Sequence, residues 1–188
     1  MLSKIIRIVL IAAMLAGLIL VWSKSGEWKN TAREEATRPQ TKYVEASKAL
    51  IAALDITDLK GKPAKLPGTG RYRLINYWAT WCGPCLMEMP LLNEFARSKA
   101  VGDVLVIGIA LDEADAVKDY LKKTPSKYQQ FLEKAGKNDS SNQLGNESGI
   151  IPFSVLIGPD GRLLKLKRGV FADADELKAF IKAPKASD

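Results

Sequence analysis

The sequence predicts an α/β fold with a central mixed β-sheet flanked by helices. Strand-like and helix-like segments alternate along the chain, which is typical of a sheet covered by helices. Val104–Leu111 is apolar throughout, as expected for a strand that is covered on both faces. Near the C-terminus, two strand-like runs flank Pro159-Asp160-Gly161, which predicts an antiparallel hairpin in the same sheet.

The first elements of this fold are expected between residues 43 and 79. Apolar residues at helical spacing predict a short amphipathic helix over 43–54. Residues 55–66 are predicted to form an N-terminal β-hairpin that turns at Lys60-Gly61-Lys62. Arg73–Ala79 is rich in β-branched and aromatic side chains, which favour a strand.

A helix is expected to begin at the next segment, which contains Cys82 and Cys85, and to run to about Lys99. Pro90 should kink this helix because proline lacks a backbone N–H. After the apolar strand, Asp112 is predicted to be the N-cap of a second helix over 113–123.

The C-terminal third is expected to form a hairpin and a last helix. Residues 124–149 are polar and contain several Gly, Asn, Asp and Ser residues, so we expect a loop. The hairpin strands are predicted over 153–157 and 163–167. Asp173, with Glu176 three residues later, predicts a capping box for a helix through Lys182.

The N-terminus predicts a membrane anchor. Ile5–Trp22 is apolar except for Arg7, and as a helix it would be roughly 27 Å long, close to the thickness of a bilayer core. The preceding positive charges place the N-terminus in the cytoplasm and the rest outside. We therefore expect a transmembrane anchor or signal-anchor over 1–22, a linker over 23–42 and a domain over 43–188. A cleaved signal peptide is the alternative, and it exports the domain as well.

The composition indicates a globular domain and argues against nucleic-acid binding. The 188 residues are 47% hydrophobic and 26% charged, which suits one globular domain with appendages. The net charge of +7 comes from scattered lysines and arginines without interleaved aromatic side chains, so no nucleic-acid partner is expected.

The two cysteines, Cys82 and Cys85, form a CxxC pair that could bind a metal, close a loop or cycle between dithiol and disulfide. Structural zinc usually requires four Cys or His ligands, and this chain has two cysteines and no histidine, so we expect no metal. A loop this short constrains the unfolded chain little, so a staple is a poor explanation. At a helix N-terminus, Cys82 would be favoured as a thiolate, which is the attacking species in thiol–disulfide exchange.

The segment NYWATWCGPCLMEMP resembles the active-site segment of the thioredoxin superfamily, and in particular its TlpA/ResA-like branch, which includes the CcmG/DsbE proteins. The stretches DITDLKGKPAKL and LGNESGIIPFSVLIGPDGRL are also similar to that branch. The resemblance covers roughly Leu50 to the C-terminus. It implies a thioredoxin-like fold and a membrane-anchored domain in the periplasm or outside the cytoplasmic membrane.

The resemblance also implies roles for individual residues. Cys82 matches the nucleophile, Cys85 the resolving cysteine, and Glu88 a glutamate that assists proton movement; the alternative for Glu88 is an ordinary exposed helix glutamate. Pro152 matches a cis-proline that faces the cysteine pair, so Ile151 would line the substrate groove.

Further residues are expected to line this groove, and one position differs from the pattern of the wider superfamily. Trp81, Gly83 and Pro84 are expected in the groove as well. Asn76 stands where thioredoxin has a buried aspartate, and an amide cannot accept a proton, so we expect a hydrogen-bonded buried polar group there.

The direction of electron flow is predicted from Gly83-Pro84. This pair is that of thioredoxin, a reductant at about −270 mV, and no histidine precedes the second cysteine. We expect a protein disulfide reductase that needs no cofactor beyond its own disulfide and receives electrons from a membrane donor. Its substrates would be protein disulfides, for example in cytochrome c or cuproprotein maturation. The alternatives are a periplasmic oxidant or isomerase, and a redox-inactive binding module.

Overall fold

The computed structural model of the chain describes residues 36–98 and 104–182. The chain divides into two units, residues 1–37 and 38–188, and the elements named below belong to the second. The predicted anchor over 1–22 lies outside the described residues, as does most of the predicted linker. Within the described ranges, no helix is both long enough and apolar enough to cross a membrane.

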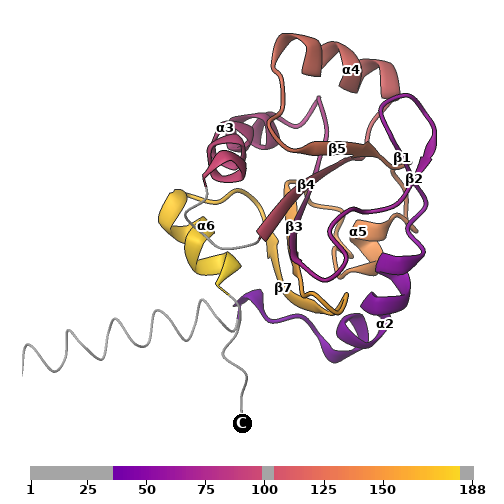
Figure 1. Cartoon of the computed structure of the whole chain (residues 1–188), viewed down its shortest axis with the longest axis vertical. Coiled ribbons are helices and arrows are strands. Elements are labelled where there is room, and N and C mark those ends of the chain that lie inside the picture. The colour runs from indigo at the N-terminus through magenta and orange to yellow at the C-terminus, as the bar shows by residue number, and fades with distance from the viewer. Residues whose placement is uncertain (1–35, 99–103, 183–188) are drawn as a thin grey trace, which may run out of the picture. The chain divides into compact units, whose positions relative to one another are not determined.

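A mixed sheet of seven strands forms the centre of the domain, as the sequence predicts (Figure 1). Its spatial order is β2-β1-β5-β4-β3-β6-β7. The middle strands β3, β4 and β5 are parallel, and every other neighbouring pair is antiparallel. The strands are β1 Ile56–Thr57, β2 Pro63–Ala64, β3 Tyr72–Trp78, β4 Val104–Ala110, β5 Gln129–Leu132, β6 Phe153–Ile157 and β7 Leu163–Arg168.

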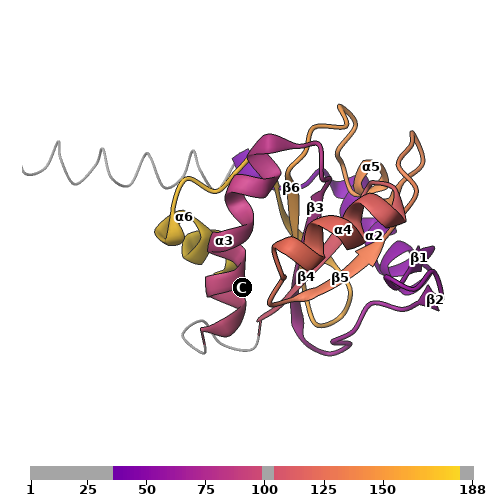
Figure 2. The same ribbon diagram turned by 90° about the horizontal axis from the view of Figure 1, so that it is seen from above.

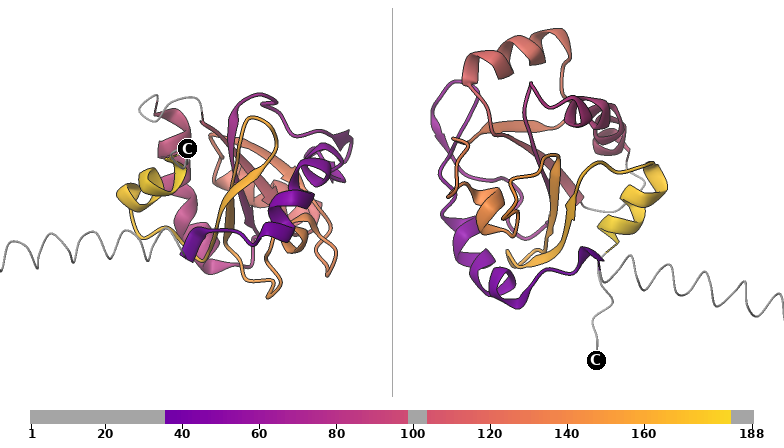
Figure 3. Two further views of the ribbon diagram at one scale, coloured as in Figure 1. Left: turned by 90° about the horizontal axis from the view of Figure 1, so that it is seen from below. Right: turned by 180° about the vertical axis from the view of Figure 1, so that it is seen from behind.

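Helices cover both faces of this sheet. The described helices are α2 Thr41–Ala52, α3 Gly83–Arg97, α4 Ala114–Lys123, α5 Ser140–Gln143 and α6 Ala174–Ile181. Figures 2 and 3 show α3 and α6 together on one side of the sheet and α2 and α5 on the other. The antiparallel pairs β1–β2 and β6–β7 confirm the two predicted hairpins, and α6 confirms the predicted last helix. Helix α3 continues through Pro90.

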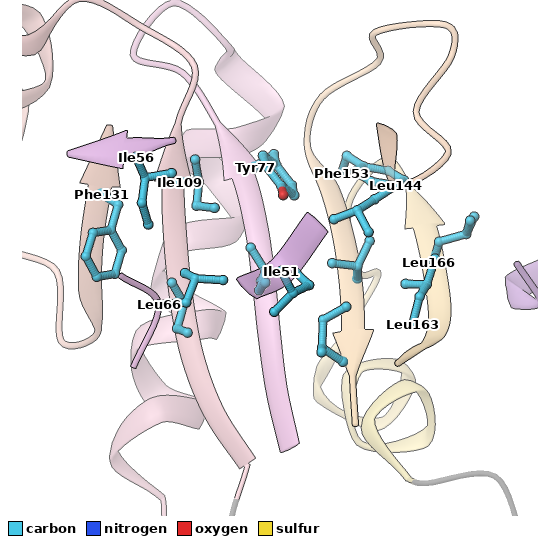
Figure 4. Packing of buried hydrophobic residues seen from close by; sticks show 14 of the residues in the cluster. Ile51, Ile56, Leu66, Tyr77, Ile109, Phe131, Leu144, Phe153, Leu163 and Leu166 are labelled. Carbon is cyan, nitrogen blue, oxygen red and sulfur yellow. The ribbon is translucent and has the colours of Figure 1, made fainter. Parts of the chain in front are cut away.

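The alternation of side chains along β3 divides the core. Ile75 and Tyr77 point to the α2 side, where they join the cluster shown in Figure 4. Leu74 packs on the opposite face with residues of α3 and α6. Trp78, on that same face, joins the cysteines in a third cluster. This alternation decides which β3 side chains reach the helix that carries the cysteines.

The prediction of a loop over 124–149 is wrong. The segment contains β5, which lies between β1 and β4, and the short helix α5. β5 has only two apolar residues, so its pattern is too short to identify from the sequence. It is stabilised by non-local pairing and by the burial of Phe131, which is 1% exposed.

The prediction of Asp112 as a helix cap is also wrong. Helix α4 begins at Ala114, and its N-cap, Glu113, makes no side-chain capping bond. The Asp112 carboxylate instead accepts hydrogen bonds from the backbone N–H and the hydroxyl of Thr80, at 2.7 and 2.5 Å. It satisfies polar groups in the loop that leads to the cysteines, which a local capping pattern could not reveal.

The predicted cap of the last helix is confirmed. Asp173 is the N-cap of α6, and its side chain accepts a hydrogen bond from the N–H of Glu176 at 2.8 Å. The Glu176 carboxylate in turn accepts from the N–H of Ala172 at 2.7 Å. Two backbone donors at the start of α6 therefore have partners.

Candidate functional site

The cysteine pair lies at the junction between the end of β3 and the start of α3. Cys82 and Cys85 are joined by a disulfide, with their Cα atoms 5.3 Å apart. Cys82 is the N-cap of α3, and its sulfur accepts a hydrogen bond from the Cys85 N–H at 3.2 Å. Unpaired N–H groups and the positive end of the helix dipole would stabilise a thiolate at this position after reduction.

Both cysteines are largely buried, Cys82 at 6% exposure and Cys85 at 2%. The neighbouring Gly83 and Pro84 are exposed, and Pro84 lies in the first turn of α3, where its missing N–H needs no partner. Trp81, Gly83 and Pro84, which flank Cys82 at the start of the helix, are therefore all exposed to solvent.

The loop before β6 faces the disulfide. The Ile151–Pro152 peptide bond is cis, as predicted. The Ile151 carbonyl oxygen lies 3.6 Å from Cys82 Sγ, so residues far apart in the sequence meet at the reactive sulfur. The Asn146 side chain donates to the Ile150 carbonyl at 3.0 Å, and the Gly169 N–H donates to the Pro152 carbonyl at 2.8 Å. These bonds hold the loop against the cysteines.

Glu88 is buried, at 3% exposure, so the alternative of an ordinary exposed helix glutamate is wrong. Its Oε2 accepts a hydrogen bond from the side-chain amide of Asn76 at 3.0 Å, and its Oε1 accepts from the backbone N–H of Phe171 at 2.6 Å. The Asn76 amide also donates to the Ser154 hydroxyl at 3.1 Å. Asn76 is therefore the hydrogen-bonded buried polar group that the sequence predicts.

The burial of Glu88 moves its pKa toward neutral pH. Removal from water raises the pKa of Glu88 from its ordinary value to about 7, and the hydrogen bonds from Phe171 and Asn76 oppose this rise only in part. A carboxyl group with a pKa near 7, one helical turn beyond Cys85, can hold or release a proton at neutral pH.

Two functional features were missed by the sequence analysis. The Phe171 N–H and the Ser154 hydroxyl complete the Glu88 network, and both come from segments that follow the cis-proline. The bond from Asp112 to Thr80 fixes the loop before Cys82. The sequence carries no local signal for a contact of this kind, because the partners come from different strands and loops.

The large exposed apolar side chains come from segments next to the cysteines or next to the cis-proline loop. Among the described residues, the large hydrophobic side chains with the greatest exposure are Trp81 at 71%, Met87 at 74%, Ile150 at 50% and Val170 at 38%. Trp81 adjoins Cys82, Met87 is on α3, Ile150 precedes Ile151, and Val170 follows the glycine bonded to Pro152. Exposed apolar side chains around one reactive group favour a protein surface as the binding partner.

Trp78, at the end of β3, is buried, in contrast to the exposed Trp81. Trp78 is fully buried, packs against Tyr120 of α4 with ring centroids 5.7 Å apart, and donates to the Gln130 side chain at 2.9 Å. The Gln130 side chain passes directly over Gly108, where an added Cβ would lie 2.0 Å from Gln130 Oε1. Trp78 supports the cysteine loop from beneath rather than lining the groove.

Taken together, a closed disulfide at a helix N-terminus, opposite a cis-proline, defines a thiol–disulfide exchange site on a thioredoxin-like fold. The comparisons with known proteins agree. The Redoxin family matches residues 40–181. The chain is 32% identical, over 131 residues, to the thiol-disulfide oxidoreductase ResA of Bacillus thuringiensis subsp. konkukian (strain 97-27), covering 68% of this chain and 72% of that protein.

A second relative matches nearly the whole chain. The sporulation thiol-disulfide oxidoreductase A of Bacillus subtilis (strain 168) is 27% identical over 186 residues, which cover 96% of this chain and 98% of that protein. Among solved structures, a thioredoxin-related protein from Neisseria meningitidis serogroup B superposes with a TM-score of 0.57 at 31% identity, covering 68% of this chain and 96% of that one. The chain belongs to the Redoxin family, in the TlpA/ResA-like branch of the thioredoxin superfamily, and is a thiol-disulfide oxidoreductase.

Proposed function

We propose that this oxidoreductase acts mainly as a disulfide reductase on proteins outside the cytoplasm. The observation that carries the direction is Gly83-Pro84 between the cysteines, in a chain without histidine. A histidine before the second cysteine would stabilise the thiolate and hence the reduced form, which makes a pair more oxidising. Proline supplies no such charge, so the disulfide form is favoured and the dithiol readily gives up its electrons.

In the proposed cycle, the Cys82 thiolate attacks one sulfur of a substrate disulfide. The substrate's other sulfur leaves as a thiolate, and a mixed disulfide forms between Cys82 and the substrate. Cys85 then attacks Cys82 Sγ, which releases the second substrate thiol and closes the Cys82–Cys85 disulfide. Two electrons and two protons pass from the pair to the substrate, and no cofactor besides the disulfide is required.

Glu88 is proposed to take the proton of Cys85 as that thiol becomes a nucleophile. Its support is its position one turn beyond Cys85, its burial and its pKa of about 7. A carboxyl group with that pKa can accept a proton and return it without a large free-energy penalty in either direction. Asn76 and Phe171 position its two oxygens.

Substrate proteins are proposed to bind over Trp81, Gly83 and Pro84 on one side and Ile151 and Pro152 on the other. An extended substrate segment can pair with the backbone beside the cis-proline while its disulfide reaches Cys82. Substrates in cytochrome c or cuproprotein maturation fit the family resemblance. The proposal also includes tethering to the membrane through residues 1–22 and a membrane electron donor. The donor is needed because an oxidising compartment would otherwise keep the cysteine pair as a disulfide.

The reduction potential tests the direction. Equilibration of the purified chain with dithiothreitol buffers, followed by thiol labelling, should give a value near that of thioredoxin, about −270 mV. A value above about −150 mV, nearer the strong oxidant DsbA, would overturn the reductase proposal. If no reversible two-electron change occurs at Cys82 and Cys85, the chain is an inert binding module.

A trapping experiment tests the roles and finds the substrate. In Cys85→Ser, the mixed disulfide on Cys82 cannot resolve, so covalent complexes should accumulate and mass spectrometry of the captured chain would name the partner. Cys82→Ser is the matched control, and it should capture nothing. The reverse pattern would show that the attacking cysteine is Cys85.

A further inference from the structure

A cavity of about 310 Å³ lies at the end of the sheet where β3 begins, away from the disulfide, which follows the other end of that strand. Its walls come from α2, the loop after β2 and the turn between β6 and β7. None of the residues assigned above to disulfide exchange lines it. Its volume is within the range of small-molecule sites, roughly 300–1,000 Å³.

Arg73 lines this cavity and is 4% exposed. Its Nε is buried and has no hydrogen-bond partner in the described ranges. Burial lowers the pKa of Arg73 from its ordinary value, and no neighbouring group offsets this effect. Arginine nevertheless stays protonated in proteins, so a cation whose Nε is buried and unpartnered faces the cavity.

The other charges around the cavity do not neutralise Arg73. Asp160 also lines it, but its carboxylate is already occupied by the Lys48 ammonium at 2.9 Å and the Arg162 N–H at 3.0 Å. Lys65 adds a further cation to the wall. The cavity therefore carries an excess of positive charge, which suits an anion.

Apolar side chains form the opposite part of the wall. Ile51 from α2, Leu54 just after α2 and Leu66 from the loop line the cavity, and Ile51 and Leu66 are buried in the core cluster of that face (Figure 4). A ligand that is only an inorganic anion would leave this apolar surface unused. The wall thus favours an anion that carries a short apolar group.

The loop that covers the Arg73 side chain requires a glycine at position 68. Gly68 has a φ of +77°, and a Cβ there would lie 2.8 Å from Leu105 Cδ2 and 3.7 Å from Arg73 Cγ. Only glycine lets the backbone pass this close to β4 while covering the arginine stem. The cavity is therefore formed by the fold itself and does not depend on a ligand.

We propose that this cavity binds a small organic carboxylate. Its carboxylate would pair with the Arg73 guanidinium, which can donate two parallel hydrogen bonds, and its short apolar chain would rest on Ile51, Leu54 and Leu66. The site is independent of the cysteine pair and of the proposed direction of electron flow.

Hexanoate is the probe for a test by NMR on the full-length, ¹⁵N-labelled chain in mild detergent micelles. The Arg73 Nε–Hε signal, assigned by its absence in Arg73→Met, should shift to saturation, together with the amide signals of residues 65–69 and 160–161. Arg73→Met should weaken binding at least tenfold, as read from the amide signals. Lys178→Met, which removes an exposed cation on α6, should bind as the unaltered chain does.

Two further ligands make the test decisive. Hexanamide has the same shape without the charge, and inorganic phosphate has charge without the apolar chain, so both should bind at least tenfold more weakly than hexanoate. Equal binding of hexanamide, equal binding of phosphate, or unchanged binding by Arg73→Met would each overturn the proposal. If Arg73→Met did not fold, the comparison of hexanoate with hexanamide on the unaltered chain would still decide.

Discussion

The side-chain amide of Asn76 lies 3.0 Å from Glu88 Oε2, so a neutral donor on β3 holds a buried carboxyl group on α3. No ion pair with a described residue accompanies this bond, and Glu88 is one helical turn beyond Cys85. A neutral donor stabilises the carboxylate only partly, so burial prevails and the pKa of Glu88 rises to about 7. This pairing leaves a buried carboxyl group on α3 whose protonation changes near neutral pH.

The pKa of Glu88 makes stability depend on pH. Because the folded pKa of about 7 exceeds the ordinary value of 4.5, the folded oxidised protein binds this proton more tightly than the unfolded chain does. The stabilisation is complete below pH 4.5 and is lost as the pH rises through 7. Between pH 5 and pH 8 the free energy of unfolding should fall by roughly 2–3 kcal/mol from this group.

Glu88→Gln should remove this part of the pH dependence while keeping the hydrogen bond from Phe171. Urea unfolding of both oxidised proteins at several pH values gives the comparison. Parallel stability curves for the two proteins would show that Glu88 does not titrate in this range.

Asn76→Asp should place a second carboxyl group beside Glu88. Two buried carboxylates at hydrogen-bond distance cannot both ionise, so they would share a proton. We expect a loss of about 2–4 kcal/mol in the free energy of unfolding at pH 8, and a smaller loss at pH 5.

The control for Asn76→Asp is the double variant Asn76→Asp/Glu88→Gln, which exchanges the amide and the carboxyl group across the same contact. It should recover most of the stability at pH 8. No recovery would mean that Asn76→Asp acts through Ser154 or through packing and not through Glu88.

Trp81→Ala should impair exchange with proteins while sparing the chemistry at the disulfide. Trp81 is 71% exposed next to Cys82, so its removal should leave the fold intact. Exposed aromatic side chains at interfaces commonly contribute more than 1 kcal/mol to binding. We expect kcat/KM for the reduction of insulin to fall about tenfold, the equivalent of about 1.4 kcal/mol.

The rate of reaction of the Trp81→Ala disulfide with dithiothreitol is the internal control, because this small thiol does not need the apolar surface. It should stay within about twofold of the unaltered protein, that is, within about 0.4 kcal/mol. An equal loss in both reactions would place the role of Trp81 in the disulfide itself.

Gly108→Ala should destabilise the support beneath the cysteine loop. The new Cβ would meet the Gln130 side chain, which bonds to Trp78 Nε1. Overpacking of this kind typically costs about 1–3 kcal/mol. Denaturant unfolding of Gly108→Ala, Gln130→Ala and the double variant measures the coupling, and the double variant should be more stable than the sum of the single effects implies. Additive losses would contradict the contact.

Local patterns were sufficient for most of the elements. The apolar run of β4, the turn at Pro159-Asp160-Gly161 and the cap at Asp173 each depend on neighbours in sequence, and each is present in the structure. β5 was missed, because its stability comes from pairing with β4 and β1 and not from its own four residues.

The sequence by itself determined the chemistry of this protein. Cys82-Gly83-Pro84-Cys85 between a strand and a helix specifies thiol–disulfide exchange, because a thiolate at a helix N-terminus needs only local residues. Tertiary structure alone decided what surrounds the pair. The hydrogen bond from Asn76 to Ser154 joins residues 78 apart, and that from Phe171 to Glu88 joins residues 83 apart. Only the packed sheet brings such partners together, and only their burial moves the Glu88 pKa. At the other end of β3, burial likewise leaves Arg73 Nε without a partner.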